Sequence, residues 1–163
     1  LHPTIPTIMA PQRLLKLTLG HYRNPDCSEE ECHRFLTEEY IPKVVEILQQ
    51  HKLETYSYHF TPSPVQNVLR AASERLQNGW TVDDHDLTVE FYFRDIAGLV
   101  TVSTDPDFIA LKAIEGPFIS QKGVVARLGW VETYVADEQV VNLIDGKSQY
   151  ESYEQASAIQ LAL

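Results

Sequence analysis

The sequence contains few of the residues and patterns that mark several large classes of protein. Of its 163 residues, 13 are Lys or Arg and 23 are Asp or Glu, so the net charge is −10. This charge repels phosphate backbones and anionic lipids, and we expect neither a nucleic acid nor a membrane as a partner. No apolar run approaches the roughly 20 residues that cross a bilayer. The hydrophobic content of 44% is instead typical of one globular domain with its own core.

Methionine and cysteine are scarce as well. The single methionine, Met9, follows a Pro-rich leader and directly precedes the first strand pattern. We interpret residues 1–8 as a remnant foreign to the natural protein and Met9 as its native start. The chain lacks the basic region followed by an apolar stretch that would indicate secretion, so a cytoplasmic location is expected. Cys27 and Cys32 would then be reduced thiols there, although a disulfide between them is possible.

Motifs for cofactors and metals are missing too. The chain has no glycine-rich loop of the type G-x-G-x-x-G or G-x-x-x-x-G-K and no H-x-H or H-E-x-x-H spacing. Cys27 and Cys32 flank a helix start, where packing explains them better than metal binding. We therefore expect no cofactor and no metal. A Ser-His-Asp triad stays open, although no nucleophile elbow indicates one.

Periodicity divides the chain into alternating strands and helices. Their order, β-α-β-(α)-β-α-β, predicts an α+β, ferredoxin-like βαββαβ fold with an extra helix between strands two and three. Strands one and three are expected to be central and parallel, with strands two and four running against them. Residues 9–136 would form this domain and 137–163 a weakly patterned tail, either mobile or an arm on a neighbour. Strands are predicted at 13–22, 51–60, 87–94 and 127–135, and helices from 28 to about 50 and at 63–77, 95–102 and 105–114.

Local signals predict where the helices start and bend. Ser28 and Glu31 have the S-x-x-E spacing of a capping box, in which each side chain satisfies an unpaired backbone donor. Ser63 is predicted to cap the extra helix in the same way. Pro42 lies inside the apolar stripe of the first helix and cannot donate to the carbonyl of Glu38, so a kink is expected there.

The stretch that contains this cap and this bend resembles the EthD family of small α/β-barrel proteins. The resemblance consists of an Arg, a Pro, a Ser-capped helix with Glu and an aromatic residue, then an acidic and an aromatic residue before Pro. The third strand and the helix that ends near Phe118 are also similar to that family. The family often has His where this chain has Tyr40. The matching residues are Arg23, Pro25, Ser28, Glu31, Phe35, Glu39, Tyr40 and Pro42.

The resemblance implies a homodimer in which two copies pair their sheets into a dimeric α/β barrel. The inserted helix and long tail resemble fungal members found beside polyketide synthases. This implies a cofactor-free lyase acting on aromatic polyketide acids, most simply a decarboxylase of a β-keto acid or anthrone precursor. The alternatives are a cyclase, dehydratase or cofactor-free oxygenase on a related substrate, or a non-catalytic binding partner of a biosynthetic enzyme.

Decarboxylation of a β-keto acid needs a hydrogen-bond donor for the developing enolate and an acid that protonates carbon. Histidine and tyrosine suit these tasks, because histidine titrates near working pH. We predict His59 as the proton donor, Tyr40 as the enolate donor, and His21 or His85 as contacts to the substrate's carboxylate or hydroxyl. The predicted substrate-binding residues are Phe91, Phe93, Leu17, Leu36, Val44 and Arg94.

The assumed strand directions give the sheet two polar ends, each with a histidine. His21 is expected near Arg94 and Arg127 at one end, and His59 near His85 at the other. A structural explanation competes at every position, because a histidine at a strand end is more often a surface or satisfied group. Tyrosine on an amphipathic helix is likewise more often part of the core.

Overall fold

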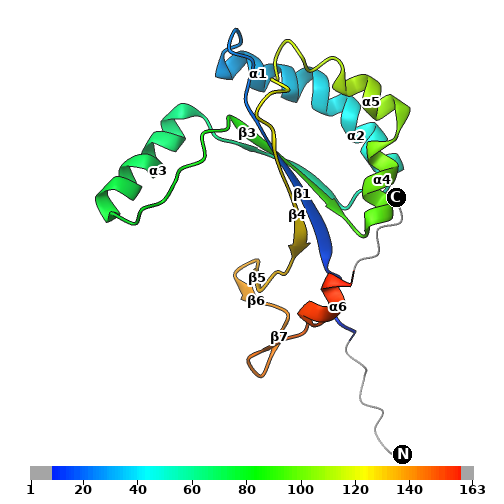
Figure 1. The fold of residues 1–163 in the computed structure, drawn as a ribbon. Coiled ribbons are helices and arrows are strands. Elements are labelled where there is room, and N and C mark those ends of the chain that lie inside the picture. The colour runs from blue at the N-terminus through cyan, green and yellow to red at the C-terminus, as the bar shows by residue number, and fades with distance from the viewer. Residues whose placement is uncertain (1–8, 159–163) are drawn as a thin grey trace, which may run out of the picture.

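The computed structural model describes residues 9–158, in which helices cover one face of a four-stranded antiparallel sheet (Figure 1). The strand order β2-β3-β1-β4, with helices between the strands, is the predicted ferredoxin-like α+β arrangement. The interpretation of residues 1–8 lies outside the described residues. The strands are β1 (Leu14–His21), β2 (Thr55–Phe60), β3 (Leu87–Phe93) and β4 (Val125–Val131), and the extra helix between β2 and β3 is α3 (Ser63–Leu76).

The direction of the two central strands corrects the sequence-based prediction. β1 and β3 are central, as expected, but they run antiparallel, with Leu15 opposite Phe93 and His21 opposite Leu87. β2 runs parallel to β1, because the helices between them bring the chain back to the end of the sheet where β1 starts. The chain then reverses direction through α3, so β3 runs antiparallel to both. His21 and Arg94 therefore lie at opposite ends of the sheet, and their expected proximity is wrong. Arg127 lies opposite Thr18 on β1, near the His21 end.

The two faces of the sheet differ in character because side chains alternate along each strand. The face under the helices is largely apolar and aromatic. The other face has no helix over it and carries polar groups, including an ion pair between Lys16 Nζ and Glu90 Oε1 at 2.7 Å. The helix-covered face is formed by Leu15, Leu17, Leu19, His21, Tyr56, Tyr58, Phe60, Leu87, Val89, Phe91 and Phe93.

The predicted capping box starts the helical layer. Ser28 Oγ accepts the Glu31 N–H at 3.1 Å, and the Ser28 N–H donates to the Glu31 carboxylate at 2.9 Å. Cys27 and Cys32 are both free and buried beside this cap, as expected for a packing role. The layer consists of α1 (Glu29–Phe35), α2 (Ile41–Gln50), α4 (Ile96–Ser103) and α5 (Pro106–Lys112).

A π-helical segment (Leu36–Tyr40) joins α1 to α2 directly before Pro42, where the kink was expected. The Ile41 N–H donates to the Leu36 carbonyl, five residues back, so this turn is wider than an α-helical one. Tyr40 at its end is buried, with 2% of its surface exposed. The wide turn is thus where this helical layer presents a tyrosine to the interior.

Three predicted boundaries are wrong, and one is that of β4, which covers Val125–Val131 instead of 127–135. Residues 51–54 form a turn, and β2 starts at Thr55. Pro62, not Ser63, is the N-cap of α3, and Ser63 is its first residue. Both the backbone N–H and the hydroxyl of Ser63 donate to the Glu29 carboxylate, so this serine anchors α3 to α1 instead of capping it.

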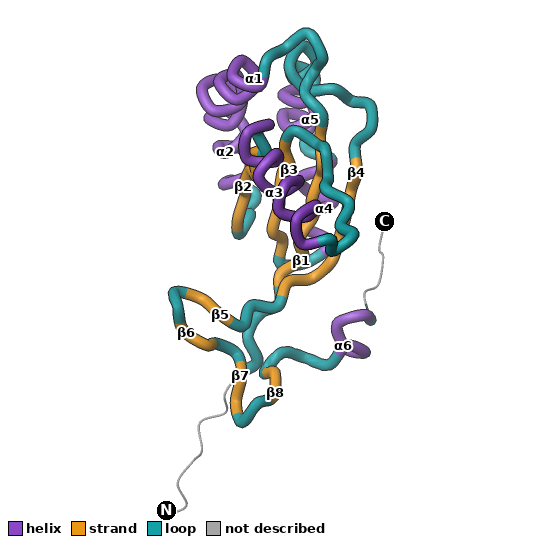
Figure 2. Tube along the Cα trace, turned by 90° about the vertical axis from the view of Figure 1, so that its left-hand side faces the viewer, coloured by secondary structure: helices purple, strands orange, loops and turns teal. Residues whose placement is uncertain are grey.

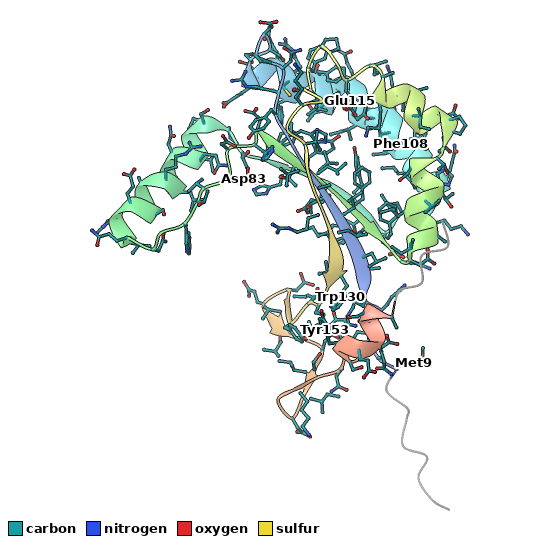
Figure 3. The ribbon with its side chains drawn as sticks, in the orientation of Figure 1. Met9, Asp83, Phe108, Glu115, Trp130 and Tyr153 are labelled. Carbon is teal, nitrogen blue, oxygen red and sulfur yellow. The ribbon has the colours of Figure 1, made fainter. Side chains whose placement is uncertain are left out.

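The C-terminal segment lies beyond one end of the sheet as two small hairpins and a short helix (Figure 2). Arg13, just before β1, pairs with Glu132 and donates to the Glu151 carbonyl at 2.7 Å. Trp130 and Tyr153 meet edge to face in the same region (Figure 3). No helix in residues 9–158 is long and apolar enough to span a bilayer. The elements are β5 (Val135–Ala136), β6 (Gln139–Val140), β7 (Leu143–Ile144), β8 (Lys147–Ser148) and α6 (Tyr153–Ser157).

The capping box yields a stability prediction. Ser28→Ala removes the acceptor of the Glu31 N–H and should lower the free energy of unfolding by about 1 kcal/mol. Chemical denaturation followed by circular dichroism measures this change. Ser157→Ala, in an exposed helical position whose hydroxyl only bonds back to the Tyr153 carbonyl, is the matched control and should be near neutral. Equal losses in both variants would contradict the capping role.

Candidate active site

A cavity of about 140 Å³ lies between the helix-covered face of the sheet and the helices α4 and α5. A protein cavity of roughly 150 Å³ binds one benzene ring, so this one has room for a single aromatic ring. Phe108 and Glu115 lie on the helical side of the sheet (Figure 3). The apolar wall consists of Leu17, Leu19, Val89, Phe91, Phe93, Val102 and Phe108, and the polar groups are His21, Tyr40, Tyr56, Tyr58, Ser103, Lys112 and Glu115.

His21 ends β1 and faces this cavity with 6% of its surface exposed. Burial, followed by the positive charges of Lys112 and His85, lowers the pKa of His21 to about 4. The imidazole is therefore neutral at neutral pH. Its buried Nδ1 has no hydrogen-bond partner among residues 9–158. A neutral imidazole with an unused ring nitrogen in a cavity has the form of a general base.

Glu115 follows α5 and brings a carboxyl group into the same cavity with 7% of its surface exposed. Burial raises the pKa of Glu115, while the neighbouring Tyr40 hydroxyl, Lys112 and Gln121 act in the opposite direction. Since its pKa is raised, the carboxyl holds its proton to higher pH than an exposed glutamate. A smaller adjoining cavity of about 20 Å³ is also lined by both His21 and Glu115. The structure thus brings a base and an acid together.

Two tyrosines of β2 add hydrogen-bond donors. Tyr56 and Tyr58 point to the same face, and their hydroxyl oxygens are 2.7 Å apart. Burial raises the pKa of both phenols, so both stay protonated at neutral pH. One hydroxyl proton joins the two oxygens, which leaves the other free to donate to a ligand. Burial and the nearby Glu115 carboxyl raise the pKa of Tyr40 in the same direction.

Half of the ten predicted site residues line this cavity. His21, Tyr40, Leu17, Phe91 and Phe93 all line the cavity. Two other predicted substrate-binding residues lie outside it. Leu36 lines the smaller adjoining cavity, and Val44 is fully buried in the core.

The remaining predicted site residues lie away from the cavity. His59 is exposed on the polar face of the sheet, because it alternates with Tyr58 along β2. Arg94 is exposed and pairs with Glu54 at the far end. These two positions correct the predicted placement of a proton donor and a substrate contact. His59 pairs with Thr88, three residues after His85, so the two histidines lie at the same end of the sheet.

His85 is buried on the other side of the sheet from the cavity, over Gly20 of β1 and stacked on Tyr22. Its Nδ1 lies 2.6 Å from Asp83 Oδ1 and its Nε2 lies 2.9 Å from the Gly123 carbonyl. Because both partners only accept, both nitrogens carry hydrogen and the ring is an imidazolium. Burial lowers its pKa, but the hydrogen bonds to Gly123 and Asp83 outweigh burial and raise it. His85 thus ties together loops behind the site.

Five polar residues of the cavity were missed at the level of sequence: Tyr56, Tyr58, Ser103, Lys112 and Glu115. A signal existed for the tyrosines, because they share a strand face with Phe60. Nothing in the sequence indicated that Glu115 is buried. It precedes Gly116-Pro117 near the end of a helix, where a glutamate is usually exposed, and only tertiary packing buries it.

Known proteins resemble this chain over most of its length. The model of the EthD domain matches residues 24–122. A protein of Aspergillus terreus named a putative oxygenase is 40% identical over 85% of this chain and 87% of its own length. A conidial pigment biosynthesis dehydratase of Metarhizium robertsii is 24% identical over 80% of this chain and 92% of its own length. These relatives are named as enzymes.

Solved structures share the fold more distantly. A dimeric protein of unknown function and ferredoxin-like fold from Bacteroides fragilis has a TM-score of 0.49 and 10% identity, over 71% of this chain and 94% of its own. Likeness at this level supports no statement about function or assembly.

The buried His21 predicts how stability depends on pH. An unfolded histidine binds a proton near pH 6.5, but folded His21 binds one only near pH 4. Its contribution to stability is therefore complete above pH 6.5 and is lost as the pH falls toward 4, by up to about 3 kcal/mol. Urea denaturation at several pH values, compared between the wild type and His21→Gln, isolates this contribution. Identical pH dependence in both proteins would contradict it.

Proposed function

Because the chain belongs to the EthD family, we propose that it is a cofactor-free lyase that removes water from a β-hydroxy ketone ring of an aromatic polyketide intermediate. One observation carries this proposal: a neutral imidazole and a carboxyl group of raised pKa share a cavity sized for one ring. The relative named a conidial pigment biosynthesis dehydratase supports it.

Elimination of water assigns a role to each of the two groups. His21 Nδ1 removes the proton from the carbon next to the ketone, and the electron pair forms an enolate. The enolate then forms the carbon–carbon double bond as the β-hydroxyl leaves with the proton of Glu115. The products are the unsaturated ketone and water. Proton transfer from the His21 imidazolium to the Glu115 carboxylate restores both groups.

The tyrosines stabilise the charge that develops in this reaction. The free hydroxyl proton of the Tyr56–Tyr58 pair can donate to the ketone oxygen as it becomes an enolate. In a buried cavity this hydrogen bond is stronger than in water. Phe91, Phe93 and Phe108 enclose the ring and exclude water from the reacting carbons. Tyr40, beside Glu115, orients the acid.

Decarboxylation of a β-keto acid is the second candidate, favoured by Lys112. This cation lines the cavity and can hold a substrate carboxylate. Loss of CO₂ would leave its electron pair on the α-carbon as an enolate, which Glu115 then protonates. However, a tight ion pair with Lys112 stabilises the carboxylate in the ground state and opposes loss of CO₂. The geometry therefore favours dehydration.

Purified protein can distinguish these reactions directly. We expect it to convert a β-hydroxy ketone with a single ring to the dehydrated product, as seen by mass spectrometry. Release of CO₂ from a matching β-keto acid would favour decarboxylation instead. Uptake of oxygen would favour the oxygenase that the Aspergillus relative's name describes. Absence of all three reactions across a substrate panel would contradict an enzymatic role and favour a binding partner.

Substitutions test the assigned roles. His21→Gln and Glu115→Gln should each lower kcat by about 10²–10⁴-fold, because each removes a proton-transfer group. The kcat/KM of the wild type should stay high as the pH falls and decline only near pH 4, where His21 gains a proton. Steady-state kinetics over a pH series measures both effects.

Controls for these variants come from the other histidines. His33→Gln changes an exposed histidine of α1 and should retain full activity. His59→Gln tests the sequence-based proton donor, and we expect little loss. A large loss in His59→Gln together with an active His21→Gln would reverse the assignment.

A further inference from the structure

A small cavity of about 20 Å³ adjoins the larger one that is proposed to hold the substrate ring. One bound water needs about 10–15 Å³, so the small cavity has room for one oxygen atom but not for a second heavy atom. The two cavities are neighbours, because His21, Tyr58, Val89 and Glu115 line both of them. A ring in the larger cavity can therefore extend one small substituent into the smaller one.

Three polar side chains from separate parts of the fold line this small cavity. They are His21 at the end of β1, Tyr58 of β2 and Glu115, which follows α5. A buried water typically makes about three hydrogen bonds, so the polar groups match what one bound oxygen requires. The remaining walls are apolar and consist of Leu36, Leu87, Val89 and Ile119.

The buried nitrogen Nδ1 of His21 points to a ligand at this place. It has no hydrogen-bond partner among residues 9–158, and only 6% of the His21 surface is exposed. Native proteins rarely leave a buried nitrogen unpaired, and a bound water is a common partner. As the base of the proposed reaction, Nδ1 carries no hydrogen and needs a donor.

Each hydrogen and lone pair of one water has a suitable partner in the small cavity. Burial raises the pKa of Glu115, so its carboxyl tends to carry a proton that it can donate to the water. The water can donate one hydrogen to His21 Nδ1 and the other to the Tyr58 oxygen. Tyr58 can in turn donate to the Tyr56 oxygen 2.7 Å away, which leaves the Tyr56 hydroxyl proton for the substrate ketone.

A hydroxyl group on the substrate ring changes this pattern in one respect. It has one hydrogen where water has two. After it replaces the water and donates to Tyr58, it leaves His21 Nδ1 without a donor. It still accepts the Glu115 proton, as a leaving hydroxyl must. Replacement of the water by this hydroxyl therefore frees the base and engages the acid at the same time.

We infer that the small cavity is the subsite of the leaving hydroxyl group, and that it holds one ordered water between His21, Tyr58 and Glu115 when no substrate is bound. The role of the hydroxyl rests on the proposed dehydration, but the existence of the site does not. The subsite limits the substrates to rings with a free hydroxyl at this position, because a methyl ether needs room for a second heavy atom.

A high-resolution crystal structure of the wild type tests the water directly. We expect one ordered water within about 3.2 Å of at least two of the three polar side chains. A soak with phenol should place the ring in the larger cavity and the phenol oxygen where the water was. Absence of an ordered water, or a phenol oxygen that lies elsewhere, would overturn the inference.

Binding of phenol and anisole tests the size and polarity of the subsite without depending on any reaction. Phenol has the free hydroxyl, and anisole has a methyl ether on the same ring. A purely apolar cavity would bind anisole at least as tightly, because the methyl group buries more apolar surface. We expect instead that calorimetry gives phenol a Kd at least about ten-fold lower. Equal affinities, or tighter binding of anisole, would contradict the subsite.

A matched pair of variants tests which cavity causes this preference. Ile119→Val enlarges the small cavity, because Ile119 lines it and does not line the larger one. The two Kd values should then come within about three-fold of each other. Ile47→Val removes the same methylene from a buried position that lines neither cavity and should leave the ratio unchanged. Circular dichroism checks that both variants are folded. The same ratio in both variants would contradict the inference.

Failure of the proposed function would give a different result. If the protein dehydrates no β-hydroxy ketone but shows the water and the preference for phenol, the reaction is wrong and the hydroxyl subsite stands. If a β-hydroxycyclohexanone and its β-methoxy analogue lose water and methanol at equal rates, the elimination stands and the leaving-group subsite is wrong.

Discussion

The antiparallel register between β1 and β3 determines which side chains can meet in this protein. Leu17 lies opposite Phe91 and His21 opposite Leu87, so one face of the central pair carries both the aromatic wall and the buried histidine. β2 extends this face with Tyr56 and Tyr58. A shift of one residue would exchange this face for the polar one that carries Lys16 and Glu90. The cavity exists because this register places its lining side chains on the face that the helices cover.

The helical layer completes the cavity through an irregular turn. The π-helical segment places the buried Tyr40 against Glu115, which comes from the chain after α5. Phe35 stacks on Phe118 with ring centroids 3.9 Å apart, and this contact ties the same two regions together. The residue that differs from the family's frequent histidine is therefore a phenol beside a carboxyl group. In the proposed reaction, removal of the substrate proton is then assigned to His21 on the sheet.

What could be predicted from the sequence depended on local interactions. The box of Ser28 and Glu31, the irregularity at Pro42 and the order of elements are each encoded within a few residues, and the structure has them. The relative direction of β1 and β3 depends on how two crossovers pack, and no local pattern contains it. The burial of Glu115 could not be predicted either, because it comes from contacts between distant parts of the chain. The prediction of His59 as proton donor rests on side-chain chemistry alone, whereas strand alternation places His59 on the polar face and Tyr58 toward the cavity.

Burial acts on the proton chemistry of this cavity in one consistent direction. It disfavours every charged form, so it lowers the pKa of the base His21 and raises the pKa of the acid Glu115. Both groups are therefore biased toward the neutral forms that the proposed elimination requires, one without a proton and the other with it. The imidazolium of His85 adds to this on the far side of β1, since its charge also lowers the pKa of His21. The cavity thus favours a base without a proton and an acid with one before any substrate enters, which is the combination that the proposed elimination uses.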